Sequence, residues 1–64
     1  MKKIKLITAR LEKNITQTKL AQITGVTRQT INLIENGDYN PSIKLCIAIC
    51  KALDKTLNDI FWGA

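Results

Sequence analysis

The chain of 64 residues contains no histidine, and this absence limits the chemistry it can perform. Histidine is the commonest general base, so the chain lacks the usual means of acid–base catalysis. The only two cysteines, Cys46 and Cys50, lie four residues apart in a predicted helix. Two thiols without histidine do not complete a four-ligand zinc site within one chain, and a disulfide inside a helix is geometrically awkward. We therefore expect reduced core thiols, and no metal, cofactor or catalytic residue.

Long apolar runs are also missing. No segment approaches the about 18 uninterrupted apolar residues of a membrane span. The first ten residues are basic and then apolar, but Arg10 and Glu12 interrupt them before they reach the length of a signal peptide. We expect one cytoplasmic domain over residues 1–64 that binds no membrane. A domain this short is marginal by its own core, and many such domains gain stability by dimerising.

Acidic residues are few: ten Lys and Arg stand against five Asp and Glu, for a formal net charge of +5. This balance favours a polyanionic partner, because cationic side chains that neutralise phosphates release condensed counterions. The alternative is that the charge serves only solubility.

Helical periodicity and capping residues divide the chain into helices with short joints. We predict helices over about 4–13, 17–24, 28–36 and 43–53, and a final turn over 57–61. The residues in N-cap positions are Thr16, Thr27, Ser42 and Thr56, and the stop signals are Asn14, Gly25 and Asn36-Gly37-Asp38. In the first helix the apolar candidates are Ile4, Leu6 or Ile7, and Leu11. The fourth helix should bury a broad stripe comprising Ile43, Cys46, Ile47, Ile49, Cys50 and Leu53.

The segment from Gln17 to Asn36 is the most informative part of the chain, because it predicts two short amphipathic helices around a break at Gly25. The apolar residues of this unit are Leu20, Ala21, Ile23, Val26, Ile31 and Ile34. The polar residues of its second helix are Arg28, Gln29, Thr30 and Asn32. A helix-turn-helix presents such a polar face to the major groove of DNA.

Several short motifs in this order and spacing resemble the phage-repressor helix-turn-helix family known as Cro/CI or XRE. They are Thr16-Gln17, Leu20-Ala21, Gly25-Val26-Thr27, Ile31-x-x-Ile34-Glu35-Asn36-Gly37 and Asn40-Pro41-Ser42. The resemblance covers nearly the whole chain. It implies an all-α, five-helix domain like that of lambda repressor, with the helix-turn-helix formed by the second and third helices. Residues 1–5 and 61–63 are candidates for short terminal β-strands in a dimer.

The resemblance also implies roles at matching positions. Gln17 would bond a phosphate at the N-terminus of its helix. Arg10 and Glu35 would form an internal ion pair between the first and third helices. The complete set of expected DNA-binding residues is Thr16, Gln17, Thr27, Arg28, Gln29, Thr30, Asn32, Leu33, Asn36, Tyr39 and Asn40. Leu33 departs from the family pattern, which often has a polar, base-contacting residue at this position. We expect it either to contact a thymine methyl group or to pack against the following loop or the fourth helix of its own chain.

Ile60, Phe61 and Trp62 leave two alternatives open. They fold back onto the core of their own chain, or they bury against a twofold mate. Large aromatic residues at the end of so short a chain are hard to cover, and aromatic residues often anchor interfaces. The family commonly dimerises through its C-terminal end. We favour the dimer, with residues 1–6 as candidates to join its seam.

We therefore expect a homodimer that binds double-stranded DNA sequence-specifically and regulates transcription. We expect repression at a near-palindromic operator, with no small-molecule ligand. One alternative is an antitoxin or a restriction-modification controller built on the same domain. Another is a protein-interaction module that has lost DNA binding. An enzyme is the third, and the lack of any nucleophile–base pair argues against it.

Overall fold

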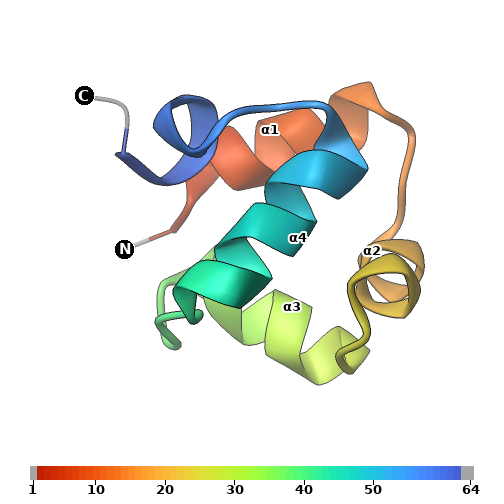
Figure 1. The fold of residues 1–64 in the computed structure, drawn as a ribbon. Helices are drawn as coiled ribbons and strands as arrows, with labels where there is room; N and C mark the ends of the chain where they lie inside the picture. Colours follow the sequence, from red (N-terminus) through yellow and green to blue (C-terminus); the bar gives the residue numbers. More distant parts are fainter. Residues whose placement is uncertain (1, 63–64) are drawn as a thin grey trace.

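The computed structural model describes residues 2–62, which form four α-helices and a C-terminal π-helical turn. The elements are α1 (Ile4–Glu12), α2 (Gln17–Thr24), α3 (Arg28–Asn36), α4 (Ile43–Leu53) and η1 (Asn58–Trp62). In Figure 1, α4 runs through the centre, with α1 above it, α3 below it and α2 to its right. The fold is all-α, as the sequence predicts, and the helix bounds agree with the predicted ones to within one residue for α1 to α4.

Capping residues determine where the central helices begin and end. Thr16, Thr27 and Ser42 adopt extended backbone angles, which stops them from continuing a helix backwards. Each side-chain oxygen accepts a hydrogen bond from the backbone N–H three residues later, at 3.0, 3.2 and 3.1 Å. Gly25 and Gly37 end α2 and α3 with φ of 79° and 81°, a region that favours glycine because it has no Cβ.

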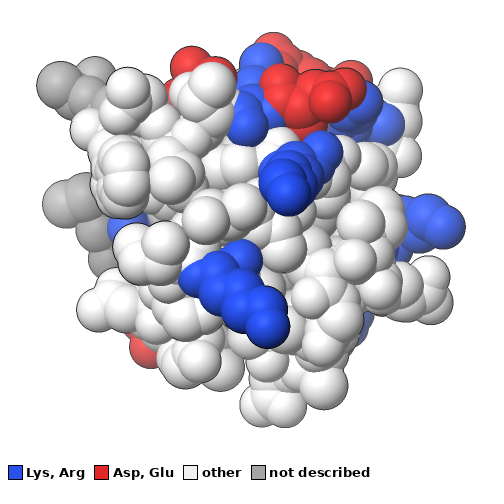
Figure 2. Space-filling view, viewed as in Figure 1, with Lys and Arg blue, Asp and Glu red and all other residues white. Residues whose placement is uncertain are grey.

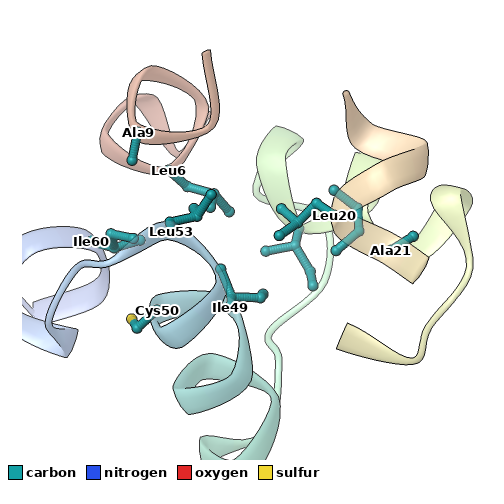
Figure 3. Close-up of a cluster of buried hydrophobic side chains, with 10 residues drawn as sticks. Leu6, Ala9, Leu20, Ala21, Ile49, Cys50, Leu53 and Ile60 are labelled. Atoms are coloured by element: carbon teal, nitrogen blue, oxygen red, sulfur yellow. The ribbon is translucent and has the colours of Figure 1, made fainter. Parts of the chain in front are cut away.

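A single hydrophobic core joins all five elements. Its largest fully buried side chains are Leu6, Leu20, Ile31, Ile34, Ile49 and Leu53. Figure 3 shows that Leu6 of α1, Leu20 of α2 and Ile49 of α4 point toward the same central space. Full burial of such a side chain contributes about 1.5–3 kcal/mol. The core therefore fixes how α2 and α3 sit on the rest of the molecule.

Five of the apolar residues proposed for buried faces lie largely on the surface instead: Ile4, Leu11, Ile23, Ile43 and Ile47. The prediction for them was wrong because periodicity shows the direction of a helix face but not how much of it the neighbouring elements cover. On α4, Ile49 lies at the centre of the buried arc, whereas Ile43 and Ile47 lie on its flank.

The prediction of short terminal strands is also wrong for the described residues, because Lys5 lies in α1 and Phe61 lies in η1. Met1 and Gly63 lie outside residues 2–62. At the C-terminal end, Thr56 Oγ1 accepts from the Asp59 N–H at 3.1 Å, and Asp59 Oδ2 accepts from the Thr56 N–H at 2.9 Å. This reciprocal capping box starts a helical turn, so the chain coils where the strand was expected.

The two cysteines on α4 are buried and carry free thiols. Burial raises the pKa of both Cys46 and Cys50 above the ordinary value, so both are protonated at neutral pH and unreactive. Within residues 2–62, no group of three or more Cys, Asp or Glu side chains comes together as a metal site. None of the helices in this part of the chain has the length and apolar character to span a membrane.

Candidate nucleic-acid interface

The turn between α2 and α3 is stabilised by backbone hydrogen bonds and by buried side chains. The N–H groups of Gly25 and Val26 both donate to the carbonyl of Ala21, at 2.9 and 3.0 Å. Ala21 is itself buried, and its small side chain allows α2 and α3 to approach closely. Behind the turn, Ile31 and Ile34 of α3 have no exposed surface. The helix-turn-helix is therefore a rigid unit whose outward side chains have defined positions.

The residues expected to bind DNA gather at three neighbouring parts of the structure: the start of α2, the outer face of α3 and the loop after it. The exposed members are Thr16, Thr27, Arg28, Gln29, Tyr39 and Asn40. The half-buried members are Gln17, Thr30, Asn32, Leu33 and Asn36. Half-burial of Leu33 leaves both of its alternatives open, since part of its surface faces the protein and part faces solvent.

An ion pair connects α1 to α3 behind this surface. Arg10 Nε donates to Glu35 Oε2 at 2.6 Å, and Arg10 Nη2 donates to Glu35 Oε1 at 3.3 Å. Arg10 Nη1 also donates to the Ile15 carbonyl at 2.9 Å. Removing one partner of such a pair costs about 3–5 kcal/mol, because the other charge is left buried and unpaired. The pair therefore holds α3 at a fixed angle to α1.

Gln17 extends this network to the outer face of α3. Its Nε2 donates to Glu35 Oε1 at 2.9 Å, and its Oε1 accepts a long bond of 3.5 Å from Arg28 Nη1. A carboxylate only accepts and a guanidinium only donates, so the two neighbours determine which end of the Gln17 amide faces each of them. Sequence reasoning missed this link, because its members are far apart in the chain. The contact of Gln17 with a phosphate stays a prediction.

Two further bonds lie on α3 itself. Asn36 Nδ2 donates to Asn32 Oδ1 at 3.2 Å, and the hydroxyl oxygens of Thr27 and Thr30 are 3.0 Å apart. Residues four apart lie on one side of a helix, so the spacing of the two asparagines was the available signal for their contact. The Asn32 amide oxygen is therefore turned toward Asn36, at the end of α3.

Charge on the helix-turn-helix is of one sign. From Lys13 to Gly37 the only acidic residue is Glu35, and it is buried with Arg10. The surface of α2 and α3 therefore carries the cations Lys19 and Arg28 and no exposed carboxylate. In Figure 2, most acidic side chains of the visible face gather at its upper edge, and the lower right part, over α2 and α3, shows none. A polyanion would meet no repulsion there.

The three C-terminal residues expected at a dimer interface have different environments. Ile60 is 5% exposed and belongs to the core of its own chain. Phe61 is half-buried against the same core. Trp62 is 61% exposed and retains a large apolar surface.

Comparisons with known proteins agree with this geometry. A family profile described as helix-turn-helix matches residues 6–60. The uncharacterized HTH-type transcriptional regulator YgzD of Bacillus subtilis (strain 168) is 47% identical over 60 residues, which cover 94% of this chain and 88% of the relative. The uncharacterized HTH-type transcriptional regulator MJ0272 of Methanocaldococcus jannaschii is 50% identical over 48 residues, covering 75% of this chain and 73% of the relative. The crystal structure of the restriction-modification controller protein C.AhdI from Aeromonas hydrophila superposes with a TM-score of 0.83 at 28% identity, covering 89% and 86% of the two chains.

Proposed function

Because this chain belongs to the helix-turn-helix family of XRE-type transcriptional regulators, we propose that it is a repressor that binds a near-palindromic DNA operator as a homodimer. Membership of the family makes it a DNA-binding regulator. The sign of regulation, the form of the operator and the dimer are the proposed parts.

One observation supports the choice of the DNA-reading face. Arg28 and Gln29 are exposed on α3, whereas Ile31 and Ile34 on the other side of that helix are completely buried. A guanidinium can pair with guanine O6 and N7, and a glutamine amide can pair with adenine N6 and N7. Lys19 of α2 lies on the same unit and supplies a further cation for the phosphates. Thr16, Tyr39 and Asn40 flank α3 as the residues proposed to contact the sugar-phosphate backbone.

The size of the chain supports a twofold arrangement on DNA. The molecule measures 27 × 23 × 20 Å. Successive major grooves on one side of the duplex are about 34 Å apart, so one copy presents its α3 to one groove only. Two copies related by a twofold axis would read the same half-site in opposite directions, which makes the operator near-palindromic.

The second copy is proposed to cover an apolar face that we assign to Ile43 and Ile47 of α4 together with Trp62 of η1. All three are large apolar side chains, and they are exposed by 58%, 39% and 61%. Figure 2 shows a broad uncharged area on the left of the view, on the side where η1 and the start of α4 lie in Figure 1. Trp62 of one copy would be the aromatic anchor of this contact. Ile60 supports it from within the core rather than touching the mate.

Repression is the simplest mechanism for such a protein. A dimer bound over a promoter blocks polymerase by occupancy, which requires only the DNA-binding unit and the dimer contact. Activation would require a second surface that binds polymerase, and repression is therefore the function proposed.

Selection of bound duplexes from a random DNA pool with the purified protein tests this proposal. The expected result is an enriched near-palindrome whose half-site centres are about 10 base pairs apart, or a multiple of that spacing. Enrichment of a single half-site would contradict the homodimer. A bound pool that stays random would contradict sequence-specific recognition altogether.

A controller of a restriction-modification system is the second candidate, favoured by the fold shared with C.AhdI. Both candidates bind an operator through the same unit, so the location of the operator separates them. A controller should bind upstream of a restriction endonuclease gene and change its transcription in a reporter assay. An operator that controls only unrelated genes would exclude this second role.

A further inference from the structure

Asn36 occupies the last turn of α3, where it contacts another side chain of the recognition helix. From this bond we infer that Asn36 is a specificity-determining positioning residue: it sets the hydrogen-bonding polarity with which Asn32 faces a base pair. The inference rests on the proposed sequence-specific DNA binding and deepens it. Asn36 would then act through Asn32, and not by the backbone contact that its place in the family motif implies.

The bond turns the oxygen of the Asn32 amide toward Asn36 and uses one of its two lone pairs. Asn36 Nδ2 donates to Asn32 Oδ1 at 3.2 Å, and both residues are half-buried, so their rotation is restricted. An asparagine amide has one acceptor oxygen and two N–H donors. With its oxygen turned toward Asn36, Asn32 offers its N–H donors to a ligand on the outer side of α3.

This polarity predicts the bases that Asn32 reads. A free asparagine reads adenine by donating to N7 and accepting from N6 at the same time. An asparagine that turns only its donors toward the groove favours base pairs whose exposed groups are acceptors, such as guanine O6 and N7 or thymine O4. Arg28, one turn before Asn32 on α3, is also a donor-only side chain. The two together would match a half-site that presents adjacent acceptor groups.

Substitution of Asn36 by aspartate tests the polarity directly. Aspartate cannot donate, so Asn32 must reverse its amide in order to donate to the new carboxylate. Its carbonyl oxygen then faces the groove and accepts from adenine N6 or cytosine N4. Asn36→Asp should therefore change the preferred base at one base pair in each half-site. The ratio of the affinities for the old and the new base should change by about fivefold or more, the lower end of what one base contact contributes. Asn36→Ala should broaden the preference at the same base pair.

Asn40→Asp is the matched control. It adds the same negative charge beside the DNA, at an exposed loop residue, so it should weaken binding to all sequences equally. Selection from a random pool is carried out with the unmodified protein and all three variants. An enriched motif for the unmodified protein, changed at one base pair by Asn36→Asp only, supports the inference. The same motif for the unmodified protein and Asn36→Asp overturns it, whereas no motif for the unmodified protein overturns the proposed function itself.

Side-chain amide NMR provides a readout that does not require DNA. In the unmodified protein the hydrogen-bonded, downfield NH₂ signal should belong to residue 36. In Asn36→Asp it should move to Asn32, because that amide becomes the donor. Unchanged Asn32 NH₂ signals in a variant that still folds would overturn the inference, since the bond would not depend on which residue donates.

Discussion

At the residue scale, Arg28 is the side chain that we propose contributes most directly to base recognition. It is exposed at the first position of α3, and Gln17 accepts a long hydrogen bond from its guanidinium. Arg28→Ala should weaken operator binding by about 1–3 kcal/mol and relax the preference at one base pair, because a bidentate contact to guanine is lost. Titration of operator duplexes with each base substituted in turn measures this effect. The fold should be unchanged, because Arg28 lies outside the core.

Lys19→Ala is the matched control, because it also removes an exposed cation from the helix-turn-helix. It should weaken binding to all sequences alike. It should also reduce the slope of log affinity against log salt concentration by about 1, the contribution of one phosphate contact. Equal loss of affinity for operator and scrambled DNA in both variants would contradict the assignment of Arg28 as a base reader.

The sequence indicated the outward residues of α3 but not how they are held. Arg28 and Gln29 stand directly after the N-cap Thr27, so their exposure on the first turn follows from a local pattern. The Gln17 amide is different, because its partners come from α3 and it reaches them only after α1, α2 and α3 have packed. Such contacts depend on how the helices pack against one another. The hydrophobic periodicity of a single helix therefore does not predict them.

At the scale of elements, the helices could be predicted closely and their buried faces only in part. Capping residues such as Thr16 and Gly25 act on the backbone beside them. The first and last residues of α2 can therefore be predicted from the local sequence. Burial depends on neighbours instead. Ile23 of α2 and Ile43 of α4 fit the periodicity of a core face but lie beyond the edge of what the other helices cover.

The C-terminal turn η1 is stabilised by a local cap at its start. Thr56 and Asp59 cap each other reciprocally, and the turn carries Ile60 into the core. Thr56→Ala should lower the free energy of unfolding by about 1 kcal/mol, measured by urea denaturation, because a helix cap is lost. Thr18→Ala, at an exposed position inside α2, should leave it nearly unchanged. Equal effects of the two substitutions would show that the cap contributes nothing.

Asp59 makes the same element sensitive to pH. The backbone N–H and then the side chain of Thr56 lower the pKa of Asp59 below its ordinary value of 3.8, with a smaller contribution from nearby lysines. A carboxyl group whose pKa is lowered by folding stabilises the folded state above the unfolded pKa, and this stabilisation is lost as the pH falls through the folded value. Asp59→Asn should therefore be less stable than the unmodified protein at neutral pH and equally stable once the pH is below the lowered pKa of Asp59 in the folded protein. Urea denaturation at several pH values measures this, and a difference independent of pH would contradict it.

At the scale of the whole molecule, the surface proposed to bind DNA and the surface proposed to form the dimer lie on different parts of the protein. The cationic helix-turn-helix contains Lys19 and Arg28 without exposed carboxylates, and the apolar face contains Ile43, Ile47 and Trp62. Both are joined to one core, so a twofold contact at the apolar face would set the separation of the two copies of α3. Base recognition and dimerisation should therefore be separable by mutation.

Ile47→Asp and Trp62→Ala should each shift the protein from dimer to monomer, because the first places a charge in the apolar contact and the second removes its aromatic anchor. Sedimentation should report twice the chain mass of 7.2 kDa for the unmodified protein and about the single mass for the variants. Ile23→Asp is the control, since Ile23 is equally a half-exposed isoleucine but lies on α2, outside the apolar face. The monomeric variants should retain binding to an isolated half-site and lose the added affinity of the complete operator. Dimers that persist in both variants, with circular dichroism showing an intact fold, would place the twofold contact on another surface.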